Sequence, residues 1–236
     1  LTLVDMMNDT VWHAPNVELL VTRDGLGLSG KGQAELEFES GTANLDIGLR
    51  FDSVDRQLEI DTGFLKLAPS QLARLMPEMQ PLTAIDLPLS GLVKTRFDVG
   101  SGKLVRLDFD MAGGEGRFVL PKPLSGDFPV RSLTLKGQVS DGGQRFAVND
   151  LSLNLGGPSV SLGIVVDGLG TKEMSIQGEA SARDMPMDRL HEFWPPGLAD
   201  NARDWIMPNL SKGFAKEVAV RFGLKSDGND GFKLVS

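Results

Sequence analysis

The fold of this chain is decided by the stretch LDIGLRFD, which runs from Leu45 to Asp52. Apolar and polar side chains alternate along it, and successive side chains of a β-strand point to opposite faces of a sheet. The stretch therefore predicts a strand with one apolar face. The stretch VSLGIVVD, from Val160 to Asp167, repeats the pattern 115 positions later.

The repeat continues beyond this first strand. The next strand recurs at an offset of 116 positions, and each copy then enters a short helix after Pro69 or Pro186. Recurrence of one supersecondary unit is typical of an extended array. We predict three parts: a first β-groove repeat over residues 1–80, incomplete at its N-terminus, a second over 81–209, and the start of a truncated third over 210–236.

Alternation extends far beyond the repeated pair of strands. It predicts strands around residues 34–38, 45–51, 105–111, 133–139, 151–155, 160–166 and 218–224. Short glycine-containing links between them favour antiparallel neighbours. Helices are expected only over residues 70–76, 187–194 and 198–207, the last closed by Pro208.

The apolar residues of these strands are the candidate ligand-binding surface. The set comprises Leu45, Ile47, Leu49, Phe51, Leu107, Phe109, Leu133, Leu135, Leu151, Leu153, Val160, Leu162, Ile164, Val166, Val220 and Phe222. The alternation alone is compatible with two arrangements. A closed sandwich would pack these side chains against one another, whereas an open curved sheet leaves them to be covered by something else.

Composition excludes several classes of function. A net charge of −8 with scattered cations argues against a nucleic-acid surface. The chain has no cysteine, which removes disulfides, thiolate metal sites and cysteine nucleophiles. No apolar run reaches the roughly 20 residues that span a bilayer, so we expect any membrane anchor to lie outside these residues.

No catalytic or metal-binding pattern emerges. His13 and His191 have no suitable ligand partners at helical spacing, and no P-loop, His-Glu-x-x-His or Gly-x-Ser-x-Gly motif is present. The acidic run of residues 227–230 is best explained as a turn, and Asp108 and Asp110 as an exposed strand face. We expect no enzyme activity, no metal and no cofactor.

One segment carries a resemblance to a known family. Trp194, Pro195, Arg203, Trp205 and Asn209, followed by Gly213, fit a pattern of Trp-Pro, then Ala-Arg-x-Trp, then Asn-Leu-x-x-Gly before a strand. This resembles the signature of the YhdP-like branch of the large AsmA-like proteins. Residues 67–73 and 87–91 also resemble that family.

The resemblance implies a fold and a function. The implied fold is mainly β, an open, curved antiparallel sheet that forms a repeating groove with a few short helices at its edge or ends. The implied protein is anchored in the inner membrane of a Gram-negative bacterium, and its periplasmic groove carries phospholipid or another acyl-chain lipid between the inner and outer membranes. The implied membrane contacts and any envelope partners depend on parts absent from this chain.

Two alternatives remain open from the residues. The first is a structural or scaffolding β-domain of the envelope that packs its apolar faces and binds proteins rather than lipid. The second concerns Trp194 and Trp205, which either pack the helical elbow against the sheet or contact ligand. We expect packing.

Overall fold

In the computed structural model the chain is built almost entirely from antiparallel strands. The structure describes residues 2–5, 10–13, 16–38, 41–70, 73, 82–120, 126–197, 200–210, 212–226 and 232–234. Within them the alternating stretches become the strands of one 12-stranded open sheet, in the order β17-β16-β15-β14-β13-β12-β9-β8-β6-β5-β4-β3. The predicted open, mainly β fold is confirmed.

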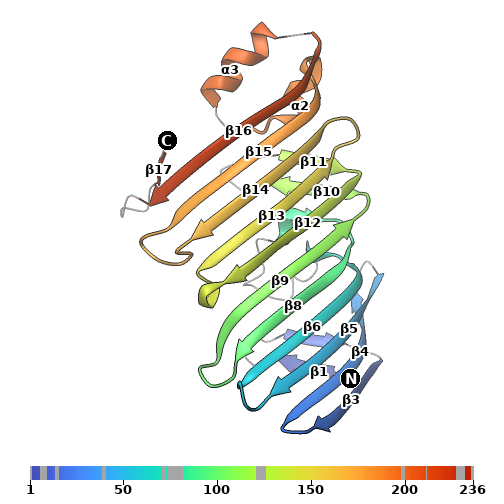
Figure 1. The fold of residues 1–236 in the computed structure, drawn as a ribbon. Coiled ribbons are helices and arrows are strands. Elements are labelled where there is room, and N and C mark those ends of the chain that lie inside the picture. The colour runs from blue at the N-terminus through green and yellow to red at the C-terminus, as the bar shows by residue number, and fades with distance from the viewer. Residues whose placement is uncertain are drawn as a thin grey trace.

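The strands of this large sheet follow one another almost in chain order. Their bounds are β3 Val17–Asp24, β4 Gly27–Phe38, β5 Gly41–Asp52, β6 Gln57–Leu67, β8 Leu89–Asp98, β9 Lys103–Gly113, β12 Ser132–Ser140, β13 Arg145–Asn154, β14 Ser159–Asp167, β15 Ser175–Pro186, β16 Phe214–Ser226 and β17 Phe232–Leu234. Figure 1 shows them side by side in a single twisted layer. Neighbours joined by short turns pair antiparallel because a tight turn reverses the chain.

A second, smaller sheet lies on one side of the large one. It consists of β7 Ile85–Asp86, β10 Gly116–Leu120 and β11 Gly126–Val130, in the order β11-β10-β7. Figure 1 shows β10 and β11 behind the large sheet, near β12 and β13. A separate hairpin joins β1 Thr2–Asp5 to β2 Thr10–His13.

The helices are short. A 3-10 turn covers Asp141–Gly143, and a second, Met187–Arg189, leads into α2 Leu190–Phe193. The helix α3 runs over Asp200–Asn209 and contains Pro208 in its last turn, where the prediction had ended it. Of the first predicted helix only Ser70 and Ala73 are described, and both are helical, as is Pro69 before them. No described helix is long and apolar enough to cross a bilayer.

The two copies of the repeat share a bend at their helical elbow. Lys66 in β6 and Asp184 in β15 adopt positive φ angles of 57° and 53°. Each lies a few residues before the proline that starts the helix, Pro69 or Pro186. A left-handed residue in a strand breaks the ladder and redirects the chain. The division into three parts stays a prediction, since one sheet runs through all of them.

Candidate functional site: an apolar sheet face

The pairing register places the whole candidate set on one face of the large sheet. Residues paired directly across an antiparallel ladder point to the same side. Leu49 pairs with Ile60, Ile60 with Thr95 and Thr95 with Leu107, and the row goes on through β12 to β16. We call this side the apolar face. Between β5 and β16 it carries all sixteen candidates, from Leu45 to Phe222.

The register also shows which lining residues sequence reasoning missed. Val93, Phe97, Phe146 and Val148 pair with Phe109, Leu104, Val166 and Ile164, and so belong to the same face. Glycine and threonine dilute the alternation of β8. In β13 a bulge between Val148 and Leu151 shifts the period. Pairing partners, rather than any local pattern, would have been needed to find them.

One half of the apolar face packs against the small sheet. Leu133 and Leu153 share a core cluster with Phe128 and Val130 of β11 and with Leu87, which precedes β8. Leu45, Leu135, Leu151 and Val160 pack against the same cluster. We call these six candidates the packed half. Leu133 is only 1% exposed, so this region is the hydrophobic core of the protein.

The other ten candidates lie outside that cluster, and we call them the open half. They are Ile47, Leu49, Phe51, Leu107, Phe109, Leu162, Ile164, Val166, Val220 and Phe222. Most are half-buried through contacts with neighbours in the sheet, and exposure rises to 55% at Val220 in β16. Soluble proteins rarely leave a large contiguous apolar surface without a role. The open half is therefore the candidate binding surface.

Aromatic rings lie against glycines in the open half. A Cβ atom added to Gly137 would lie 2.4 Å from the Phe109 ring, and one added to Gly178 would lie 2.6 Å from the Phe222 ring. Phe109 also stacks with Phe146 at 6.2 Å between ring centroids. The rings thus cover the polar backbone at these glycines, so that the surface of the open half remains apolar.

Replacing Gly137 by alanine is expected to destabilise the protein by about 1 to 3 kcal/mol. The new methyl group would lie 2.3 Å from the backbone oxygen of Ala147 as well as against Phe109, and backbone cannot move aside cheaply. Gly163 is the matched control, because an added Cβ there meets nothing closer than 3.8 Å. Equal urea midpoints for the Gly137→Ala and Gly163→Ala variants would contradict the packing described.

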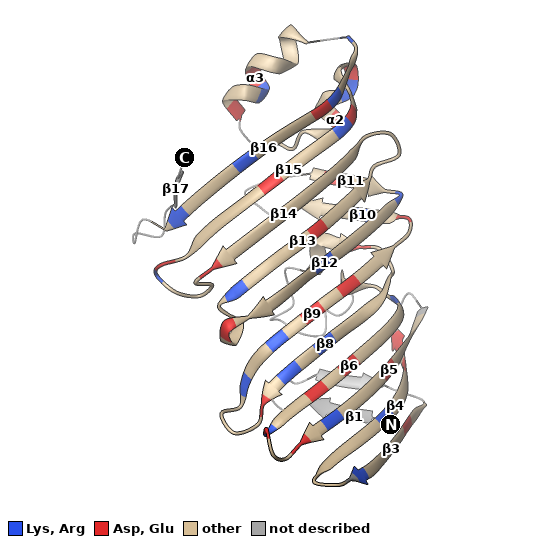
Figure 2. Ribbon diagram, viewed as in Figure 1, with Lys and Arg blue, Asp and Glu red and all other residues tan. Residues whose placement is uncertain are grey.

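The opposite, polar face is held by cross-strand ion pairs. Arg96 pairs with Glu59 at 2.9 Å and Lys136 with Asp110 at 3.0 Å. Figure 2 shows both signs of charge interspersed over the strands. Exposed pairs contribute little stability each. Together these charged side chains keep the polar face hydrated.

Three pKa values reflect such local contacts. A bidentate hydrogen bond from Arg106, with N–O distances of 2.7 Å, lowers the pKa of Asp108. Hydrogen bonds from the Ser101 backbone and hydroxyl lower the pKa of Asp98, and one from Arg189 lowers that of Glu192. All three carboxylates stay ionised at neutral pH. The described residues hold no cluster of three or more metal-ligating side chains.

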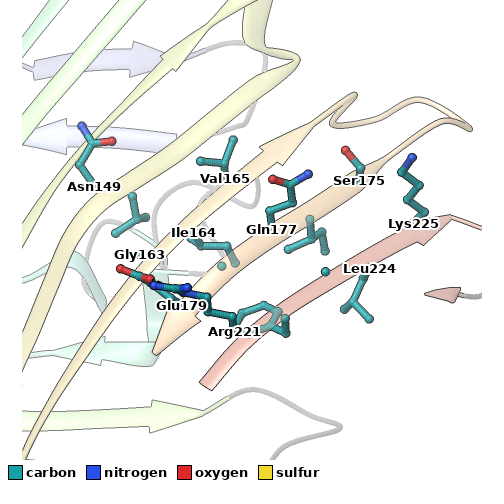
Figure 3. Close-up of a pocket in the computed structure, with 15 residues that line it drawn as sticks. Asn149, Gly163, Ile164, Val165, Ser175, Gln177, Glu179, Arg221, Leu224 and Lys225 are labelled. Carbon is teal, nitrogen blue, oxygen red and sulfur yellow. Dashed lines mark hydrogen bonds and ion pairs between the residues drawn. The ribbon is translucent and has the colours of Figure 1, made fainter. Parts of the chain in front are cut away.

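The clearest hollows open on the polar face, not on the predicted groove. One of about 670 Å³ lies over β13 to β16, and Figure 3 shows Val165, Gln177 and Lys225 projecting on its side of the sheet. Another of about 660 Å³ surrounds Gly48 and Gly63. Both occur where a strand glycine leaves a gap among polar side chains. In the first, Glu179 and Arg221 already pair with each other at 3.2 Å.

The family-like motif is only partly packed. Trp194 is half-buried, Pro195 is buried and α3 carries Arg203, whose Nε atom is buried without a partner among the described residues. Trp205 is 66% exposed, so the expectation that it packs against the sheet is wrong. Asn209 donates a hydrogen bond from Nδ2 to the Trp205 carbonyl oxygen at 2.6 Å, and the carbonyl of Gly213 accepts one from the Met187 N–H.

Comparison with protein-family models, curated proteins and solved structures finds no match for this chain.

Proposed function

We propose that this chain is a segment of a periplasmic lipid conduit whose open half binds acyl chains. The observation that carries the proposal is the register, which aligns the predicted groove residues on one face from β5 to β16. Moving an acyl chain through water exposes surface costing about 0.8 kcal/mol per methylene group. A continuous, largely apolar strip lowers that cost along its length.

The arrangement of the two halves supports an open conduit. The packed half belongs to the core cluster, where Leu133 is 1% exposed, whereas eight of the ten open-half side chains are half-buried or exposed. A lipid can then lie on the open half while its headgroup stays in water at the edge of the sheet. The periplasmic location and the membrane anchor rest on the family resemblance alone.

Native mass spectrometry of the protein after gentle extraction tests this function. We expect copurified phospholipid, or phospholipid uptake from vesicles of phosphatidylethanolamine and phosphatidylglycerol. A protein mass free of lipid after both treatments would overturn the proposal.

The second candidate is a scaffolding β-domain that binds another protein. The edge strand β3 favours it, because Leu19 and Leu20 are 70% and 67% exposed although they point to opposite faces. Edge strands with exposed apolar residues pair readily with strands of other chains. In the same mass spectra, a bound protein without lipid would select this candidate.

A further inference from the structure

Two hydroxyl groups interrupt the apolar face between β5 and β14. Thr62 in β6 and Thr95 in β8 belong to it by register, since Thr62 pairs with Ile47 and Val93, and Thr95 with Ile60 and Leu107. Every other residue that the pairing register places on this face between β5 and β14 is apolar or glycine, whereas Lys216 and Ser226 lie on the same side in β16. Threonine is common in strands, so its presence alone signifies nothing. What distinguishes Thr62 and Thr95 is their position on this face and their lack of partners among the described residues.

Neither hydroxyl has a hydrogen-bond partner among the described residues. No hydrogen bond joins the Oγ1 atom of Thr62 or Thr95 to another described residue, and neither atom is among the buried unpartnered ones. Both residues are half-buried, so the two oxygens reach the surface of the apolar face. Each hydroxyl can donate one hydrogen bond and accept others. A ligand that covered them with hydrocarbon alone would leave both unsatisfied.

The two threonines lie on adjacent strands as diagonal neighbours. Thr62 is opposite Val93 and Thr95 is opposite Ile60, and such diagonal pairs are about 7 to 8 Å apart. Hydrogen bonds between hydroxyls and oxygen span about 2.7 to 2.8 Å. Each hydroxyl therefore serves its own acceptor, and a matching ligand presents two acceptors a few ångströms apart at the head of its hydrocarbon chains.

The position of the two threonines on the face fits a ligand that has polar groups at one end and hydrocarbon chains beyond them. Val93, opposite Thr62, packs against the core cluster, whereas Ile47 and Leu107 belong to the open half. The hydroxyls thus lie beside the boundary between the two halves, and the apolar strip continues from them toward β16. A ligand fixed here has room for its chains along the open half.

We infer that Thr62 and Thr95 form a polar station that binds the two ester carbonyls of a diacyl glycerolipid. This inference rests on the proposed function, because it assigns the ligand of the same face. It selects diester lipids over single-chain fatty acids and over hydrocarbon-only ligands. Each threonine donates its hydroxyl hydrogen to one carbonyl oxygen, and the acyl chains extend over the open half.

Binding of a diester phosphatidylcholine and of its diether analogue, which lacks only the two carbonyls, tests the inference. We expect the unaltered protein to prefer the diester by about fivefold per hydroxyl, or about 25-fold for both. A variant with Thr62→Val and Thr95→Val should bind both lipids equally. Valine keeps the shape of threonine, and Thr134→Val in β12, on the polar face, is the matched control.

Each outcome has a distinct meaning. Equal binding of diester and diether by the unaltered protein would overturn the assignment of Thr62 and Thr95 as a polar station, but not the proposed lipid-conduit function. A preference that persists in the double variant would also overturn it. Binding of neither lipid would remove the proposed function itself.

Discussion

Replacing Ile164 by aspartate is expected to abolish most lipid capture while the protein stays folded. Ile164 lies on the open half and is half-buried, paired with Val148 and Gly178 on the neighbouring strands. A carboxylate there remains hydrated when no lipid is bound, but acyl chains lying over it would have to strip its water at a cost of several kcal/mol. We therefore expect at least a tenfold drop in bound lipid.

The adjacent Val165 supplies the matched control. Val165 has the same half-buried character but faces the polar side, as Figure 3 shows. The Val165→Asp variant should bind lipid like the unaltered protein. Circular dichroism and a urea midpoint measure folding, and lipid per protein by mass spectrometry measures capture. If both variants lost lipid to the same extent, the loss would reflect general damage and the assignment of faces would be wrong.

Replacing Leu133 by alanine is expected to produce the largest loss of stability among truncations on this face. Leu133 is 1% exposed and lies in the core cluster between the large sheet and the small one. Removing a fully buried leucine side chain leaves a cavity and costs about 2 to 5 kcal/mol. The free energy of unfolding should fall by this amount.

Leu65 gives the comparison for this truncation. It lies in β6 and is 55% exposed, so Leu65→Ala should cost less than about 1 kcal/mol. Urea titration with an unchanged slope separates a true stability change from a change in the unfolded state. A Leu133→Ala variant as stable as Leu65→Ala would mean that the small sheet does not cover this half.

Much of the fold could be predicted, because apolar residues at every second position identify both the strand and the face that carries them. The stretches around Leu49 and Ile164 illustrate this, since they became β5 and β14 with the expected faces. Alternation fails at bulges. Val105 fits the pattern of residues 105–111, yet a bulge between Arg96 and Phe97 pairs Leu104 rather than Val105 with Phe97.

The division into two halves could not be predicted. The covering strands are short: β7 has two residues and β10 and β11 have five each. Such elements carry too little periodic signal to be assigned a partner. The core cluster also joins Leu133 to residues far away in the sequence, such as Phe64 and Leu67 of β6. The exposure of Trp205 could not be predicted either, since the apolar pattern of α3 shows which side of the helix is apolar but not whether a neighbouring element covers it.

The binding of acyl chains by the open half is tested most directly with a photo-crosslinking amino acid placed at single positions. We expect lipid adducts at Ile164, none at Val165 on the polar face, and adducts only to protein at Leu133 in the packed half. Absence of lipid adducts at Ile164 after incubation with phospholipid vesicles, or equal adducts at Ile164 and Val165, would contradict the binding of acyl chains by the open half.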